Sequence, residues 1–305
     1  MNQIHDINAW SLYWSEDRLY SCVAHSSDED QKVLDTLWHG FSQALDPKSR
    51  LLDLATGNGA VAHAMLSVNK DLQIDAIDKA SIDPNKSLKD AGDLSGVNFH
   101  SDVDLFDLSY EASEFDAITS QFGIEYAGLI EASIHVMSYL KIGGRFQFVI
   151  HHANSDIIES SKKKISELEQ LTKKSGVLDT LIAVLGGKAE FAQLESEGQK
   201  YLMQEQPRSE QISGQVFAGI ERIINNFAIN PQSSLELGVS MDLRIRSELM
   251  RLQQLIKAGQ TEAAMTSWLE KVSTQGLDAS FSPIYLDPVK QNYLLGWLAV
   301  GVRKK

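Results

Sequence analysis

The stretch Leu51–Ala62 reads L-L-D-L-A-T-G-N-G-A-V-A, and it decides the fold of this chain. Its leucines form a short apolar run of the kind expected for a strand buried on both faces. The residues Thr56–Gly59 end that run sharply, and small and apolar residues follow from Ala60 onward. The stretch therefore predicts a strand, a glycine turn and a helix.

Such a turn lets a ligand approach the bare backbone, and the N–H groups of the following helix favour an anionic group there. Asp53 lies at the carboxyl end of the strand, two residues before the turn. Its carboxylate would repel a phosphate and hold an ammonium group. Two other interpretations stay open. Gly57–Ala62 also satisfies the G-x-G-x-x-A pattern of nicotinamide dinucleotide folds, and a tight turn can occur without any ligand.

Residues 72–78 form an alternating strand that ends in Asp78, about 20 residues beyond the glycines. At this separation a carboxylate can accept from both ribose hydroxyls. Further strands are expected at 97–101, 114–120 and 145–150. Ligands sit outside the carboxyl ends of such strands, so the loop at 121–126 should line the site.

Several features together resemble the class I S-adenosylmethionine-dependent methyltransferases. Asp53, Ala55, Gly57 and Gly59 are similar to the first motif of that family, with Ala55 in place of the usual first glycine. Alanine is tolerated there if the backbone keeps a negative φ. The resemblance covers residues 50–152 and 280–303, and it includes a Leu-Lys-Ile-Gly-Gly ending before the fifth strand and a final hairpin.

The resemblance implies an α/β fold with a seven-stranded, mostly parallel, Rossmann-like sheet. Its last strand would insert antiparallel between the fifth and sixth. It also implies S-adenosylmethionine as cofactor and S-adenosylhomocysteine as product. Asp53 would hold the ammonium group, Asp78 the ribose, and Asp102 with the Val103 backbone the adenine. The residues expected to bind the cofactor are Asp53, Ala55, Thr56, Gly57, Asn58, Gly59, Asp78, Lys79, Asp102, Val103, Ser120, Gln121 and Phe122.

The acceptor side is less defined. Aromatic residues are dense between Trp10 and Tyr20, and the candidates for acceptor contact are Tyr13, Trp14, Glu125 and Tyr126. His151 and His152 follow the fifth strand and are candidate proton acceptors. A base is not obligatory, because methyl transfer can rest on positioning and exclusion of water.

Some methyl acceptors are disfavoured by what the sequence lacks. The loop after the fourth strand has no Asn/Asp-Pro-Pro-Tyr/Phe sequence, which argues against adenine N6 and glutamine side chains. No cysteine follows that strand, which closes the covalent route to cytosine C5. No metal site is predicted.

We expect three parts in the chain. Residues 1–49 form an N-terminal helical and aromatic segment that caps the site. Residues 50–153 and 278–305 form the cofactor-binding domain, and residues 154–277 form a helical insertion with repeated apolar helical faces. Such an insertion would act as a lid over a small substrate, or as a dimerisation surface.

Composition limits the classes of partner. The formal net charge of −13 over 305 residues makes nucleic acid an unexpected partner. Cys22 is the only cysteine, and neither a secretory signal nor a membrane span is found, so a cytoplasmic location is expected. The prediction is methyl transfer to an oxygen or nitrogen of a small molecule. The alternatives are an NAD-dependent oxidoreductase, a methyltransferase acting on a macromolecule, and a non-catalytic cofactor-binding protein.

Overall fold

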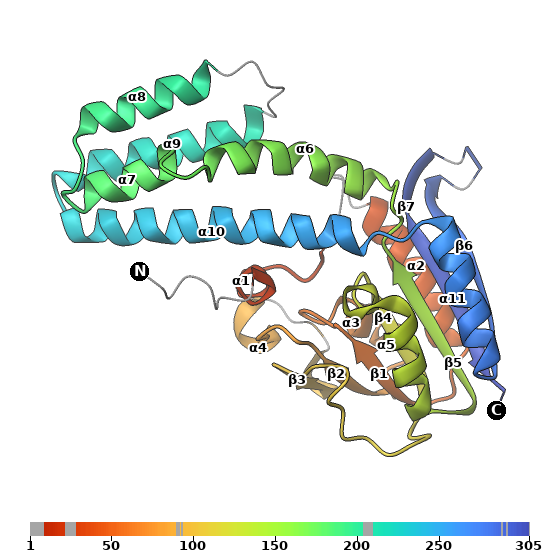
Figure 1. Cartoon of the computed structure of the whole chain (residues 1–305). Helices are drawn as coiled ribbons and strands as arrows, with labels where there is room; N and C mark the ends of the chain where they lie inside the picture. The colour runs from red at the N-terminus through yellow and green to blue at the C-terminus, as the bar shows by residue number, and fades with distance from the viewer. Residues whose placement is uncertain are drawn as a thin grey trace. The chain divides into compact units, whose positions relative to one another are not determined.

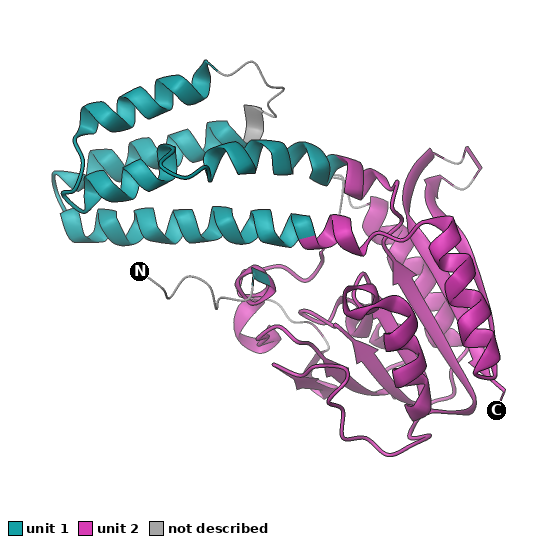
Figure 2. Ribbon diagram, viewed as in Figure 1, with its two compact units in different colours: residues 1–9, 160–253 teal, residues 10–159, 254–305 magenta. Residues whose placement is uncertain are grey.

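The computed structural model describes residues 9–21, 29–89, 92, 94–203, 210–287, 289–290 and 292–304 (Figure 1). Cys22 lies outside them. The chain divides into two compact units, shown in different colours in Figure 2. One contains residues 160–253, and the other contains residues 10–159 and 254–305.

The larger unit is built on a seven-stranded sheet within the described residues. Its strands are β1 (Arg50–Leu54), β2 (Gln73–Ile77), β3 (Val97–His100), β4 (Phe115–Gln121), β5 (Leu140–Ile150), β6 (Leu277–Asp287) and β7 (Asn292–Arg303). They lie in the order β3-β2-β1-β4-β5-β7-β6, and β7 is antiparallel to both of its neighbours. The predicted Rossmann-like sheet and the predicted insertion of the last strand are therefore confirmed.

Apolar residues cover both faces of this sheet. On one face, α2 (Glu29–Gln43) and α3 (Ala60–Leu66) bury Leu34, Trp38 and Met65 against the strands. On the other, α5 (Leu129–Val136) and α11 (Glu262–Thr274) share one apolar cluster with the strands, α11 lies against β6 and α5, and Trp268 is fully buried. Shorter helical segments are α1 (Ala9–Trp14), α4 (Pro84–Ser87), η1 (Leu94–Gly96), η2 (Ile124–Ala127) and η3 (Met137–Tyr139).

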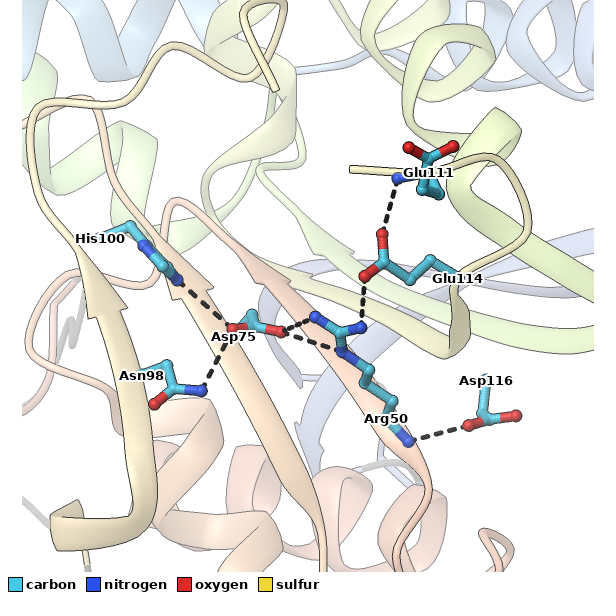
Figure 3. A network of polar contacts seen from close by, with 7 residues as sticks. All are labelled: Arg50, Asp75, Asn98, His100, Glu111, Glu114 and Asp116. Carbon is cyan, nitrogen blue, oxygen red and sulfur yellow. Dashed lines mark hydrogen bonds and ion pairs between the residues drawn. The ribbon is translucent and has the colours of Figure 1, made fainter. Parts of the chain in front are cut away.

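Residues 101–114 connect β3 to β4. The structure describes all of these residues, and they form no helix. The strands beside this connection carry polar residues (Figure 3). Arg50 donates twice to Asp75 Oδ2, at 3.0 and 3.2 Å, and also pairs with Glu114. Asn98 and His100 each lie 3.3 Å from Asp75 Oδ1. We call these five residues the Arg50 network.

The smaller unit contains only helices and their connections over its described residues, and it has its own core. Its elements are α6 (Asp156–Leu171), α7 (Val177–Leu185), α8 (Phe191–Leu202), α9 (Glu210–Phe227) and α10 (Pro231–Ala258), of which α6 and α10 also extend into the larger unit. Leu171, Leu181 and Leu252 are fully buried between these helices. None of the helices in the described part of the chain combines the length and apolar character that a membrane span requires.

The two chain crossings that flank α6–α10 are hydrogen-bonded to each other. His151–Ala153 leads out of β5, and Gln260 leads from α10 into α11. Ala153 N–H donates to Gln260 O at 2.9 Å, and Gln260 N–H donates to His151 O at 2.7 Å. The predicted insertion 154–277 contains α6–α10 and also α11, but α11 packs in the sheet core because Met265, Trp268 and Val272 are buried there.

Candidate functional site

The glycine turn forms at the carboxyl end of β1, as predicted. Its φ angles are +52° at Ala55, +56° at Gly57 and +88° at Gly59. The expectation that Ala55 keeps a negative φ is therefore wrong. The turn places this residue in the left-handed region, where the methyl group costs free energy. Asp102 after β3 and Phe122 after β4 also have positive φ, of +59° and +52°, so three strand ends at this edge carry backbone strain.

Asp53 lies in β1 beneath the turn and is completely buried. The Thr119 hydroxyl in β4 donates to its Oδ1 at 2.7 Å, a contact that the sequence analysis did not predict. Its Oδ2 makes no hydrogen bond of good geometry with a described residue. Burial raises the pKa of Asp53 to about 7, reinforced by Asp78 and opposed by the hydroxyls of Thr56 and Thr119. A cationic ligand would restore its charge.

Asp78 follows β2 and is also buried, with 8% of its surface exposed. Its Oδ2 accepts from Gly57 N–H and its Oδ1 from Ala80 N–H, both at 2.7 Å. Burial raises the pKa of Asp78 to about 6, opposed by these two backbone donors. Each carboxylate oxygen has a second lone pair, so both can still accept from a diol. The carboxylate also holds the glycine turn in place.

The residues predicted to bind adenine lie beside Asp78, but the backbone amide of Val103 already has a partner. Val103 N–H donates to Asp78 O at 2.9 Å, so the structure pairs the amide that was expected to meet a ring nitrogen. Asp102 is exposed, and its Oδ2 accepts from the Ser101 hydroxyl at 2.6 Å. Lys79 is exposed and pairs with Asp104 at 2.6 Å.

The end of β4 is fixed by side chains from other elements. The buried Ser120 hydroxyl donates to Leu54 O and accepts from Ile124 N–H, both at 3.0 Å. The Gln121 amide oxygen accepts from Trp38 Nε1 at 2.6 Å, which the sequence analysis missed because Trp38 fits an apolar helix face. Phe122 stacks on His151, with ring centroids 4.4 Å apart. These contacts join β1, β4 and β5 at their carboxyl ends.

Glu125, Tyr126 and His151 form a cluster at this edge. His151 N–H donates to Glu125 Oε1 at 2.9 Å, and the Tyr126 hydroxyl lies 3.3 Å from His151 Nε2. Burial raises the pKa of Glu125 to about 7, opposed by backbone N–H groups. Tyr126 is half-buried and meets the edge of the Trp10 ring.

His152, the second candidate base, lies apart from this cluster. It stacks on Trp297 at 4.3 Å, and its Nδ1 accepts from Asn154 N–H. Burial lowers the pKa of His152, and Glu262 partly offsets this. The structure therefore brings His151, and not His152, together with Glu125 and Tyr126.

The N-terminal aromatic residues also reach the glycine turn. A Cβ atom placed on Gly57 would lie within 2.7 Å of three indole carbons of Trp14. The Asn58 amide donates to Trp14 O at 3.0 Å and to Arg18 O at 2.8 Å. Tyr13 packs edge-on against Trp14, with centroids 5.0 Å apart, and Arg18 lies over the Tyr13 ring.

The chemistry of these residues fits a nucleoside that carries a cationic group. Asp78 offers acceptor oxygens for a diol, and Asp53 offers a buried oxygen for an ammonium group directly or through water. A pyrophosphate would meet carboxylates on both sides of the turn. These carboxylates therefore favour a cationic nucleoside over a dinucleotide.

Comparisons with known proteins support the fold. No protein-family model matches the chain, and no curated protein matches it significantly. Among solved structures, the plantazolicin methyltransferase BpumL, in complex with a pentazolic desmethylPZN analogue and SAH, is 11% identical. That match covers 92% of this chain and 87% of BpumL, with a TM-score of 0.50.

Two other solved structures match a smaller part of the chain. The 4+2 cyclase SpnF is 26% identical over 39% of this chain and 46% of its own, with a TM-score of 0.35. Geranyl diphosphate methyltransferase, in complex with GPP and sinefungin, is 15% identical over 39% of this chain and 44% of its own, with a TM-score of 0.34. The chain thus spans less than half the length of these two proteins. Because one fold can host unrelated reactions, the match to BpumL speaks for architecture and not for activity.

Proposed function

We propose that this chain, which has the fold of the class I S-adenosylmethionine-dependent methyltransferases, transfers a methyl group from S-adenosylmethionine to an oxygen or nitrogen of a small molecule. One observation carries the proposal. The buried carboxylates of Asp53 and Asp78 lie on either side of a glycine turn at the carboxyl ends of β1 and β2. This arrangement suits an ammonium group and a ribose, and it opposes a pyrophosphate.

The cofactor would supply an electrophilic methyl group on a sulfonium centre. Asp53 would hold the ammonium group, with Thr119 orienting its carboxylate. Asp78 would bind the ribose hydroxyls while it keeps Gly57 in place. Asp102 would face the adenine from the loop after β3. These residues bind and orient the donor, and orientation is the main requirement of an in-line displacement.

On the acceptor side, Tyr126 and His151 are the pair that could accept a proton from a hydroxyl or amine. Their 3.3 Å separation lets the imidazole take up a proton that passes through the phenol. We assign the helical unit α6–α10 the role of a lid, because it is inserted directly after β5. BpumL, which has the same fold, was solved with both SAH and a pentazolic desmethylPZN analogue.

The test is isothermal titration calorimetry with S-adenosylhomocysteine and, separately, with NADH. We expect micromolar binding of the first and no heat from the second. Asp78→Asn should weaken S-adenosylhomocysteine binding by about 10- to 100-fold, because the ribose loses a charged acceptor.

Asp75→Asn is the matched control, because Asp75 lies only three residues before Asp78, inside β2, but belongs to the Arg50 network. Its affinity for S-adenosylhomocysteine should stay within about twofold of the unmodified protein. Binding of NADH, or equal loss of affinity in both variants, would contradict the proposed cofactor site.

A further inference from the structure

The geometry points to Trp14 as an internal plug of the cofactor site. In this conformation its indole lies on the glycine turn in the space that the nucleoside of the cofactor needs, so α1 must move before the cofactor can bind. This inference rests on the proposed function.

The position of the indole carries the argument. It presses on the side of Gly57 where a Cβ atom would point, within 2.7 Å of that hypothetical atom. It also packs in one apolar cluster with Ala80 and Ile82, which lie two and four residues after the ribose-directed Asp78. Trp14 is only 7% exposed. The ring therefore fills the space between the glycine turn and the segment after β2, the two places expected to hold the nucleoside.

Several polar contacts hold α1 and the following turn in this place. The Asn58 amide donates to the carbonyl oxygens of both Trp14 and Arg18. Ser81 N–H donates to the Ser11 hydroxyl at 2.8 Å, and Lys89 N–H donates to Asp17 at 3.0 Å. Each of these partners belongs to the glycine turn or to the segment after β2. Asn58 of the candidate site and two residues after β2 thus bind the chain's own N-terminal segment.

An aromatic side chain that occupies the site lowers the apparent affinity for the cofactor but leaves the intrinsic affinity of the open site unchanged. The measured dissociation constant equals the intrinsic constant divided by the fraction of molecules in which the plug has left. Removing the indole should therefore tighten cofactor binding, whereas removing a residue that stacks on the cofactor would weaken it.

The first experiment measures S-adenosylhomocysteine binding by calorimetry to the full chain and to Trp14→Ala. We expect at least about tenfold tighter binding for Trp14→Ala, since about a tenth or less of the molecules would be open. Trp14→Phe is the matched control, because it keeps an aromatic ring on the turn and should stay close to the unmodified protein. Weaker binding by Trp14→Ala would overturn the plug and make Trp14 a cofactor contact.

A second experiment locks α1 in place. Ser11→Cys with Ser81→Cys, in a Cys22→Ser background, uses the Ser81–Ser11 contact, which brings the two residues into the range that a disulfide spans. Oxidation should reduce S-adenosylhomocysteine binding at least tenfold, and dithiothreitol should restore it. The single Ser11→Cys variant should not respond to either reagent.

The outcomes separate the two proposals. If the oxidised lock and Trp14→Ala both bind like the unmodified protein, while Asp78→Asn binds more weakly, then the cofactor site stands and the plug is refuted. If no form of the protein binds S-adenosylhomocysteine, the proposed cofactor site fails, and the plug fails with it.

Discussion

Asp75 and Asp78 lie three residues apart in the sequence, one inside β2 and one just after it, and the chain accommodates their buried carboxylates in different ways. Asp75 receives the Arg50 guanidinium and contacts from Asn98 and His100 (Figure 3). Asp78 and its neighbour Asp53 receive only hydroxyl and backbone donors among the described contacts, and their pKa values are raised to about 6 and about 7. Asp75 has its cation within the protein. Asp53 and Asp78 have no such cation among the described contacts, so their carboxylates can bind one from a ligand.

We expect the largest effect on stability from removing the ion pairs of Arg50. Arg50→Met leaves Asp75 and Glu114 without their cation, and we expect it to lower the free energy of unfolding by about 3 kcal/mol. This is the lower end for a buried pair, because Arg50 is partly exposed. Chemical denaturation measures the loss. Lys141→Met, which removes an exposed partner of Asp116, is the control and should cost at most about 0.5 kcal/mol. Equal losses would mean that the Arg50 network stabilises no more than a surface pair does.

The raised pKa of Asp53 should make the stability of the protein depend on pH. The folded state keeps a proton on Asp53 up to about pH 7, whereas the unfolded chain loses it near pH 4. The folded form is favoured by this proton at low pH, and the contribution is lost as the pH rises through about 7. Asp53→Asn should remove about 2 kcal/mol of this decline.

Denaturation curves between pH 5 and pH 8 would measure that difference between the unmodified protein and Asp53→Asn. Part of the decline should remain in the variant, because Asp78 and Glu125 also have raised pKa values. A variant whose decline with pH is as steep as that of the unmodified protein would show that Asp53 is ionised in the folded state.

The smallest effect concerns the backbone of the turn. Ala55 has a φ of +52°, which glycine adopts without strain, so Ala55→Gly should raise the free energy of unfolding by about 0.5–1 kcal/mol. Thermal unfolding would detect this. Ala62→Gly, in the middle of α3, should have the opposite sign and cost about 1 kcal/mol. If both variants lose stability, the turn does not hold Ala55 in the left-handed region in solution.

The parts of the fold that depend on local pattern were predictable from the sequence. The leucines before Asp53, the glycine turn and the alternating strand up to Asp78 form where the sequence analysis placed them. The final hairpin was also predictable from the sequence. Its strands β6 and β7 extend beyond their most apolar residues, because hydrogen bonds between the strands continue past them.

What escaped prediction depends on contacts between distant residues. The conformation of Ala55 is set by the turn and not by its own preference. The Val103 amide is taken by Asp78 O, and Thr119 reaches Asp53 only because β4 pairs with β1. The apolar pattern of α11 is like that of the helices before it, so sequence could not show that Trp268 belongs to the sheet core. The indole of Trp14 on Gly57 has no signal in the sequence beyond the density of aromatics.

The paired crossings at His151–Ala153 and Gln260 have a consequence for how such a chain can evolve. Ala153 and Gln260 are more than 100 residues apart in sequence but share a hydrogen bond of 2.9 Å. A genetic replacement between them would therefore start from two neighbouring ends of the chain. The first turn of α6 and the last turns of α10 carry Ile158 and Leu255, which belong to the sheet core. A lineage can thus exchange residues 160–253 as a module, provided that it keeps these two core residues.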